Sequence, residues 1–283
     1  MQTVISASRR TDIPAFYLDW FLSRLNAGEF RLINPFNGRV RKVPVSKNSV
    51  HSIVFWSKNY AQVLERLSEL KGWRLFFQFT LNSENSLLEP GVPPLAERKE
   101  QMRLLVEIFG PRAVRWRFDP VVCYESDGRT HDNLGDFESL LDFAAGLGLE
   151  ACTVSFMDPY RKIDQREKRI PGFRFIYPEH ARMLETASWM ASLAASRGIT
   201  LFTCCEKELA RAGIDNLGGG SCIDHNLLIE LYGGSLSLAP DRGQRRSSGC
   251  LCYESIDVGS YREQPCRCGC LYCYANPLVR RRS

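Results

Sequence analysis

The chain has 283 residues, of which 44% are hydrophobic, so it can bury the core of one large domain or of two small ones. Its formal net charge of +5 permits an anionic partner but does not require one. No segment approaches the roughly 18 to 20 consecutive apolar residues that cross a bilayer, and the first residues lack the basic stretch and apolar core of a secretory signal, so we expect a cytoplasmic protein that does not enter a membrane.

Strand-like and helix-like segments alternate along the first 205 residues. Short runs rich in β-branched and aromatic residues predict strands at residues 4–8, 52–56, 74–80, 113–118, 150–156 and 199–204. Apolar residues spaced three and four apart predict helices between them, at residues 15–26, 61–70, 96–109, 133–147 and 178–196. Strands that are apolar on both faces and alternate with helices indicate an α/β fold with a parallel sheet, closed as a full or partial (β/α) barrel of the TIM type.

Two regions depart from this alternation. Residues 30–45 predict a β-hairpin inserted after the first helix, with its turn at residues 34–38. Beyond residue 205, glycine-rich and polar segments surround one predicted helix at residues 224–231, and a last strand at residues 255–261 leads directly into a cysteine cluster. We therefore divide the chain into a barrel core at residues 1–205, which includes the hairpin, and a cysteine-rich cap at residues 206–283.

Charged side chains follow several of the predicted strands. Arg9, Arg10 and Asp12 come after the first strand, Lys58 after the second, and Arg117 and Asp119 close the fourth. Because the carboxyl ends of parallel barrel strands meet at one mouth, we expect these side chains to bind substrate or cofactor. Each of them also has a structural alternative, as a helix cap or a member of an ion pair.

The cysteines carry the strongest functional signal. The chain contains eleven of them, and seven lie between Cys222 and Cys273. Without an export signal the thiols are expected to stay reduced, so this clustering favours metal binding over disulfide formation. Cys266, Cys270 and Cys273 are separated by three and then by two residues. Three thiolates at this spacing hold three irons of a 4Fe-4S cubane and leave the fourth iron open to an outside ligand.

This motif resembles that of the radical S-adenosylmethionine (radical SAM) superfamily, in which the open iron binds the methionine part of S-adenosylmethionine. The resemblance implies a 4Fe-4S cluster on the three cysteines, S-adenosylmethionine as a second cofactor, and a place for Tyr272 near the adenine. The run at residues 269–275 is similar to the spore photoproduct lyase branch. The segments at residues 6–14, 55–59 and 116–120 also resemble an uncharacterised bacterial family, a domain of unknown function noted for this C-terminal cluster.

Two features depart from the superfamily pattern. The superfamily places its cysteines after the first barrel strand, whereas here the first of them is Cys266. A circular permutation reconciles the two, with residues 255–261 as the first strand and residues 4–8 as the second, so the expected fold is a circularly permuted barrel or partial barrel of the radical SAM type. Cys268 is an additional thiol that permits other ligand sets, including a structural zinc site in the same loop.

Cys204, Cys222, Cys250 and Cys252 form a second candidate set, with Cys205 beside the first of them. Four thiolates saturate a tetrahedral metal or a complete cubane, so this set predicts an auxiliary 4Fe-4S cluster or a zinc ion. A buried cysteine also serves as a small hydrophobic residue, and that alternative stays open for Cys204 and Cys222.

The expected activity is hydrogen-atom abstraction by a 5′-deoxyadenosyl radical. The resemblance implies a reductant such as flavodoxin or ferredoxin and a substrate that is a small metabolite, a peptide or a nucleic acid, and neither the substrate nor the oligomeric state follows from the sequence. The alternative is a binding protein, for nucleic acid as one case, in which zinc or saturated iron–sulfur centres hold the fold together and the basic tail at residues 280–282 contacts phosphates.

Overall fold

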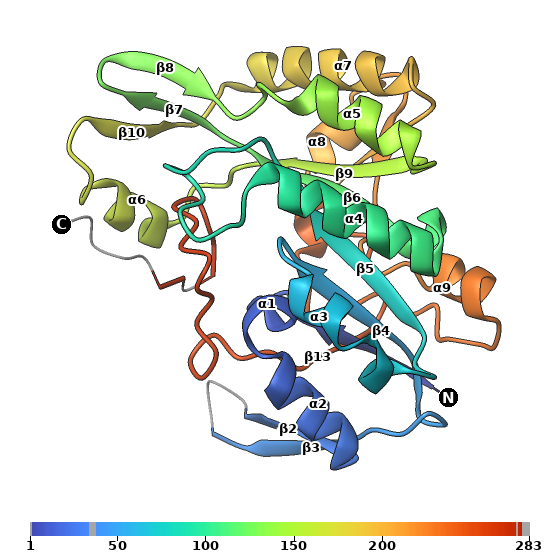
Figure 1. The fold of residues 1–283 in the computed structure, drawn as a ribbon. Helices are drawn as coiled ribbons and strands as arrows, with labels where there is room; N and C mark the ends of the chain where they lie inside the picture. Colours follow the sequence, from blue (N-terminus) through green and yellow to red (C-terminus); the bar gives the residue numbers. More distant parts are fainter. Residues whose placement is uncertain (1, 34–37, 276, 279–283) are drawn as a thin grey trace.

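A parallel sheet forms the centre of the molecule. The computed structural model describes residues 2–33, 38–275 and 277–278 (Figure 1). Within these residues, the main sheet has eight strands, in the spatial order β12 (Leu217–Gly219), β11 (Thr200–Thr203), β9 (Ala151–Phe156), β6 (Val114–Val121), β5 (Leu75–Thr80), β4 (Val50–Ser57), β1 (Thr3–Ala7) and β13 (Ile256–Asp257). All neighbouring pairs are parallel. The six strands predicted before residue 205 are confirmed, and with them the α/β class.

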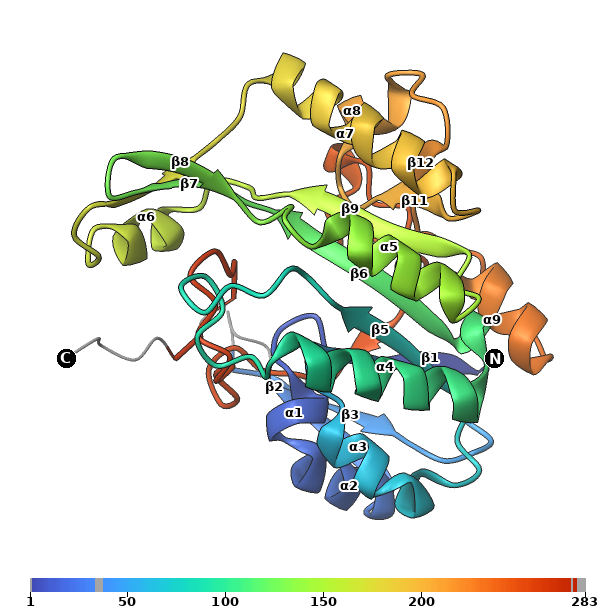
Figure 2. The same cartoon turned by 45° about the horizontal axis from the view of Figure 1, so that its top comes forward.

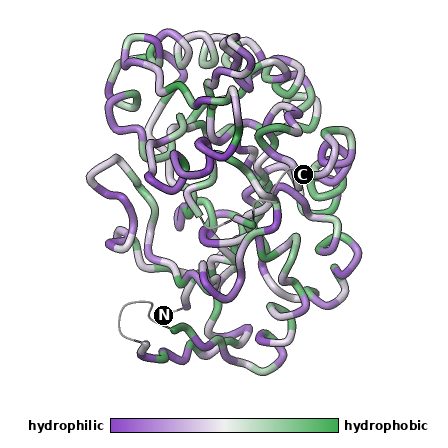
Figure 3. Tube along the Cα trace, turned by 90° about the vertical axis from the view of Figure 1, so that its left-hand side faces the viewer, coloured by the Kyte–Doolittle hydropathy of each residue, from purple (hydrophilic) through white to green (hydrophobic). Residues whose placement is uncertain are grey.

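Amphipathic helices cover one face of this sheet. They are α1 (Ile13–Phe16), α2 (Leu18–Asn26), α3 (Ala61–Glu65), α4 (Leu95–Phe109), α5 (Phe137–Gly146) and α7 (His180–Ala195), with short 3₁₀ turns η1 (Leu67–Leu70) and η2 (Pro111–Ala113). Figure 2 shows α4 and α5 lying along β5, β6 and β9, and hydrophilic and hydrophobic positions alternate along the outer helices in Figure 3. Their apolar faces bury the largest hydrophobic cluster against the strands. Among the described residues, no helix has both the length and the apolar character that crossing a bilayer requires.

The predicted hairpin insertion is confirmed. β2 (Glu29–Ile33) pairs antiparallel with β3 (Val40–Pro44). Phe30 is fully buried, and its ring packs 5.4 Å from that of Phe21 in α2, which ties the hairpin to the helix before it. Four residues of the predicted turn, 34–37, lie outside the described residues, as does the basic tail at residues 280–282.

The sheet is open rather than a closed barrel. In the part of the chain that the structure describes, β12 pairs with β11 alone and β13 with β1 alone, so the fully closed barrel is not observed. Both edge strands come from beyond residue 206: β13 lies within the strand predicted at residues 255–261, whereas β12 lies where the sequence indicated only loops. β12 is three residues long, too short to leave a periodic pattern in the sequence.

The segment between β12 and β13 covers the second face of the sheet. Val4, Val54 and Phe76 from three neighbouring strands pack against Ile223, Leu228 and Leu236 of this segment. It contains α9 (His225–Tyr232), which confirms the helix predicted at residues 224–231, and η3 (Arg246–Ser248); α8 (Lys207–Arg211) precedes β12. The chain therefore passes from one edge of the sheet to the other beneath its second face, and it brings Cys222, Cys250 and Cys252 with it.

A small antiparallel sheet stands beside the carboxyl ends of the main strands. Among the described residues it consists of β10 (Phe173–Ile176), β7 (Cys123–Ser126) and β8 (Arg129–Asp132), and α6 (Arg161–Glu167) lies next to it. The pattern of the sequence predicted none of these elements. Their apolar side chains form a separate cluster with Cys268, Cys270, Leu271 and Tyr272, so the small sheet supports the C-terminal cysteine loop (Figure 1).

Asp257 fastens β13 to the end of β1. Its carboxylate accepts hydrogen bonds from the hydroxyls of Ser6 at 2.9 Å and Ser8 at 2.7 Å, and from the backbone N–H groups of Arg9 at 2.7 Å and Gly259 at 3.1 Å. We expect Asp257→Ala to lower the free energy of unfolding by about 2–4 kcal/mol, because several donors lose a charged acceptor at once.

Urea denaturation measures this loss, and replacing the exposed Asp215 by alanine is the matched control. Equal stabilities of the two variants would show that β13 does not depend on Asp257.

Candidate functional site

The cysteine loop follows β13 and lies against residues at the carboxyl ends of four main strands. The Sγ atom of Cys268 is 3.8 Å from the Asp12 carboxylate, which follows β1. Tyr272 contacts Lys58 beyond β4 and Asn82 beyond β5, and Asn82 in turn donates to the backbone carbonyl of Asp119 in β6 at 3.4 Å. The polar residues that follow neighbouring strands therefore lie close together in this part of the site, as expected.

The thiols of the loop form a contiguous group. Cys268 interacts with both Cys266 and Cys270, and the pKa of the Cys273 thiol is raised by burial and then by Cys270 and Cys266. The pKa of the Cys266 thiol is lowered, first by the Cys268 thiol beside it and then by backbone N–H groups of Cys268 and Asp12. Cys268 is 3% exposed. The additional thiol of the motif thus lies inside the group and not at its periphery.

Distant parts of the chain hold the backbone of the loop. The N–H of Leu271 donates to the carbonyl of Leu88 at 2.9 Å, and the N–H of Gly91 donates to the carbonyl of Cys268 at 2.8 Å. Arg166 of α6 donates to the carbonyl of Cys270 at 2.9 Å and to that of Cys273. A guanidinium that binds two loop carbonyls fixes the loop and places a positive charge beside its thiols.

Gly91 permits this close approach. A Cβ atom at this position would lie 2.5 Å from the carbonyl oxygen of Arg267 and 2.8 Å from that of Cys268. We expect Gly91→Ala to displace the loop, to lower stability by about 1–3 kcal/mol and to lower the affinity of the loop for metal.

Metal content after reconstitution and the unfolding midpoint measure the two effects. Gly135→Ala is the control, since a Cβ atom there meets nothing within 4 Å. A Gly91→Ala chain that binds metal as well as the control would contradict this role of the glycine.

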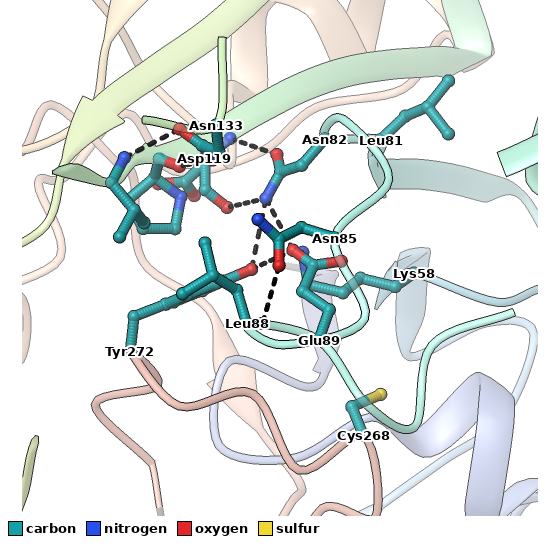
Figure 4. A network of polar contacts seen from close by, with 12 residues as sticks. Lys58, Leu81, Asn82, Asn85, Leu88, Glu89, Asp119, Asn133, Cys268 and Tyr272 are labelled. Carbon is teal, nitrogen blue, oxygen red and sulfur yellow. Dashed lines mark hydrogen bonds and ion pairs between the residues drawn. The ribbon is translucent and has the colours of Figure 1, made fainter. Parts of the chain in front are cut away.

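A buried polar network adjoins Tyr272 (Figure 4). Glu89 accepts hydrogen bonds from Lys58 Nζ at 3.1 Å, from Asn82 Nδ2 at 2.9 Å and from the Tyr272 hydroxyl. Burial would raise the pKa of Glu89, but Lys58 and the neighbouring hydrogen-bond donors outweigh burial, so the pKa of Glu89 is lowered. Burial would lower the pKa of Lys58, but the Glu89 carboxylate outweighs it, so the pKa of Lys58 is raised. The second carboxylate oxygen, Oε2, is buried and has no hydrogen-bond partner among the described residues.

Asp119 and Arg117 connect this network with the second set of cysteines. The N–H of Asp119 donates to Asn82 Oδ1 at 2.9 Å, and the Asp119 carboxylate accepts from Ser155 and from Arg117. Arg117 is 4% exposed and also donates from Nη1 to the Sγ atom of Cys222 at 2.9 Å. The two residues thus lie between the two groups of thiols.

The predicted residues after β1 divide among three places. Asp12 caps α1 by accepting from Ala15 N at 3.0 Å, accepts from Ser57 Oγ at 2.6 Å, and has its pKa raised to about 6, chiefly by burial. Arg9 lies under the second cysteine set, with its guanidinium carbon 5.2 Å from the centre of the Trp56 ring. Arg10 lies at the rim, 41% exposed, and donates to the carbonyl of Gly259 at 3.2 Å.

The second set of cysteines forms a ring of five thiols. Its members are Cys204, Cys205, Cys222, Cys250 and Cys252, and each thiol interacts with two others of the set. The structure therefore brings the four predicted cysteines together and adds Cys205, which the sequence analysis left beside the set. Within the described residues, no group of three or more His, Cys, Asp and Glu side chains has the arrangement that would hold a metal ion.

Sequence reasoning missed Asn82, Glu89, Arg166 and Asp257. Asn82 and Glu89 follow the third predicted strand by a few residues, so the rule that strand ends meet at one edge could have indicated them. Arg166 and Asp257 gave no comparable signal, because each acts on a backbone segment more than a hundred residues away in the chain.

Comparisons with known proteins identify a family but no activity. A family model described as a domain of unknown function (DUF1848) matches residues 4–275, and no curated protein matches the chain. Among solved structures, a D-hydantoinase from a Bacillus species is 12% identical, with a TM-score of 0.36 over 76% of this chain and 53% of that one. The carboxyl transferase domain of Rhizobium etli pyruvate carboxylase is 8% identical, with a TM-score of 0.29 over 98% of this chain and 41% of that one. The chain thus spans about half the length of the hydantoinase and less of the transferase.

Proposed function

The chain belongs to the family described as a domain of unknown function (DUF1848), and from the geometry of its site we propose that it is a radical S-adenosylmethionine enzyme. Cys266, Cys270 and Cys273 hold a 4Fe-4S cluster in this proposal. The observation that carries it is the position of the loop: the motif directly follows β13, a parallel strand next to β1, and faces polar residues at the neighbouring strand ends. β13 then takes the place of the first strand in a circularly permuted partial barrel.

The residues of the loop fit a thiolate-bound cluster. Backbone N–H groups point at two of the sulfurs, from Asp12 to Cys266 and from Ala275 to Cys273, the latter at 3.4 Å. Arg166 and Lys162 add positive charge near Cys273. Such donors and charges stabilise thiolates, the form in which cysteine binds iron.

The network at Glu89 fits the polar end of S-adenosylmethionine. The free Oε2 atom is a buried acceptor beside the loop, and a buried carboxylate oxygen gains most from a cationic donor such as an amino group. Tyr272 lies between this carboxylate and the cysteines, with Lys58 Nζ 5.7 Å from the centre of its ring. When bound and reduced, the cluster supplies the electron that cleaves S-adenosylmethionine into methionine and a 5′-deoxyadenosyl radical.

The apolar cluster under the loop excludes water from this site. Leu88, Leu271 and Met157 are each 8% exposed or less, and they pack around Tyr272. Exclusion of water protects a reactive carbon radical from side reactions. The side chains at the strand ends, Asp12, Lys58 and Asp119, then hold the cofactor or the substrate.

Anaerobic reconstitution tests the proposal. The chain is treated with iron and sulfide, reduced with dithionite and incubated with S-adenosylmethionine, and 5′-deoxyadenosine is measured by chromatography. We expect brown protein, about four irons per loop, and release of 5′-deoxyadenosine. A reconstituted cluster whose electron paramagnetic resonance spectrum does not respond to S-adenosylmethionine would overturn the assignment.

One observation favours a second candidate function. Cys268 interacts with both Cys266 and Cys270, and four thiolates would saturate a cluster or a zinc ion and leave no open position. The loop would then stabilise the fold of a binding protein. This candidate predicts colourless zinc protein or a cluster that is indifferent to S-adenosylmethionine.

A further inference from the structure

The five-thiol ring is built by tight backbone packing at the ends of β11 and β12. A Cβ atom on Gly220, two residues before Cys222, would lie 2.8 Å from Phe202 Cβ and 3.0 Å from the carbonyl oxygen of Thr203. Gly249, which precedes Cys250, has a φ of +96° and would place a Cβ atom 3.0 Å from Lys207 Cα. Glycine is thus needed on both sides to bring three chain segments this close.

Two buried guanidinium groups face the ring. Arg117 donates to the Sγ atom of Cys222 at 2.9 Å, and Arg9 donates to Ser255 Oγ at 3.1 Å and lies 3.8 Å from the Asp241 carboxylate, near Cys252 and Cys222. Both lie over the same Trp56 ring, 5.2 and 5.3 Å from its centre. In the described part of the chain, the buried Nη2 atom of Arg9 has no hydrogen-bond partner.

Neutral thiols do not explain this arrangement. A set of cysteines that only filled a core would be surrounded by apolar groups, since two guanidinium ions beside it raise the cost of burial. A metal that displaces four thiol protons leaves a tetrathiolate centre with a net charge of about −2 in the case of Zn²⁺. Arg117 and Arg9 also pair with Asp119 and Asp241, so what matches such a centre is the donor that Arg117 directs at Cys222 and the unused Nη2 donor of Arg9.

We propose that Cys204, Cys222, Cys250 and Cys252 bind a second metal centre beside the guanidinium groups of Arg9 and Arg117. Cys205 is the spare thiol. It lines a cavity of about 310 Å³ together with His180, Glu206 and Ser247, whereas Cys222, Cys250 and Cys252 are 6% exposed or less. The centre joins the end of β11 to the segment that covers the second face of the sheet.

The separation of one pair of these thiols matches the geometry of a single ion. The Sγ atoms of Cys204 and Cys222 are 3.5 Å apart, and the edge of a tetrahedron with zinc–sulfur bonds of about 2.3 Å is about 3.8 Å. Thiolates on a cubane bind separate irons and stand further apart. Zinc is therefore the expected metal, and an iron–sulfur cluster is the other centre that four thiolates can bind.

The test separates this centre from the C-terminal loop. In a full-length chain with Cys266, Cys268, Cys270 and Cys273 replaced by alanine, only the ring retains clustered thiols, so the outcome does not depend on the function proposed above. Metal content is measured after purification with zinc and after anaerobic reconstitution with iron and sulfide. Co²⁺ substitution adds a second reading, because tetrathiolate cobalt has a thiolate-to-metal charge-transfer band.

We expect about one zinc per chain in this background. Adding Cys222→Ser or Cys252→Ser should lower the zinc content at least tenfold, while Cys205→Ser and the distant Cys123→Ser should leave it unchanged. Arg117→Met should weaken zinc binding about 10- to 100-fold in a chelator competition. About four irons per chain in place of zinc would support the centre and identify it as a cluster.

Two results would overturn the proposal. One is a folded chain, by circular dichroism, that binds neither metal. The other is zinc that survives both Cys222→Ser and Cys252→Ser. If the fourfold alanine background does not fold, the same serine variants in the otherwise unchanged chain decide the question, because loss of one centre lowers total metal content while the content of the loop stays constant.

Discussion

Cys266→Ala, Cys270→Ala and Cys273→Ala are each expected to abolish release of 5′-deoxyadenosine and to remove the iron of the C-terminal loop. Each thiolate holds one iron of the proposed cluster, and loss of a direct ligand should exceed the 10- to 100-fold effect that is usual for outer partners of a metal. Iron content, the visible spectrum and 5′-deoxyadenosine yield measure the effect in anaerobically reconstituted protein.

Cys268→Ala is the decisive comparison because it changes the same loop by the same chemistry. Under the proposal this variant keeps its iron and cleaves S-adenosylmethionine within about threefold of the unchanged chain, since the fourth iron needs no protein ligand. If Cys268→Ala loses the metal as completely as the other three variants, the loop is a four-thiolate structural centre and the proposed activity is wrong.

Glu89→Ala is expected to lower the free energy of unfolding by about 3–5 kcal/mol. The substitution leaves the ammonium group of Lys58, 13% exposed, without the carboxylate 3.1 Å away, and an uncompensated buried charge is strongly destabilising. The partners Asn82 and Tyr272 lose an acceptor at the same time. Chemical denaturation of the metal-free chain measures the change without interference from the cluster.

A double-mutant cycle separates the ion pair from the rest of the network. Lys58→Met combined with Glu89→Ala should recover about half of the lost stability, because no charge then stays buried alone. Glu263→Ala, at an exposed position, should change stability by less than about 0.5 kcal/mol. Additive effects of the two single substitutions would show that Lys58 and Glu89 do not form a coupled pair.

The strands of the main sheet were predictable where they are long and buried. β4, with the run Val50–Ser57, and β5, with Leu75–Thr80, are almost entirely buried, and such continuous apolar runs flanked by amphipathic helices indicate parallel strands directly. The pairing of β13 with β1 was also predicted, through the permutation that the cysteine motif implied. The observed register places Ile5 opposite Ile256.

The small sheet and the edge strand β12 were not predictable, for the opposite reason: they are short, and they are exposed or rich in glycine. β8, Arg129–Asp132, is exposed along its whole length and has no apolar alternation. β12, Leu217–Gly219, contains two glycines, which weaken a strand signal. β8 forms because it pairs with β7, and β12 forms because it pairs with β11. The local sequence pattern of a strand does not indicate such partners.

The candidate site shows the same division. The cysteines of both sets were found because their spacing and number are unusual, and the strand-end rule placed Asp12, Lys58 and Asp119 together. That rule says at which edge of the sheet a residue lies but not how deeply its side chain is buried. Arg9 and Arg117 were therefore predicted to lie in the same binding site as Asp12, Lys58 and Asp119. In the structure they lie beneath the second set of thiols.

The placement of β13 beside β1 has a consequence for biogenesis. β1 leaves the ribosome well before its outer neighbour β13, which is made some 250 residues later, and contacts of such sequence separation form slowly. Until then the acceptor for Ser6, Ser8 and the Arg9 N–H is missing, so one edge of the nascent sheet stays exposed and liable to aggregate. The cysteine loop follows β13 in the chain, so it reaches its place beside Asp12 only after this strand has been made.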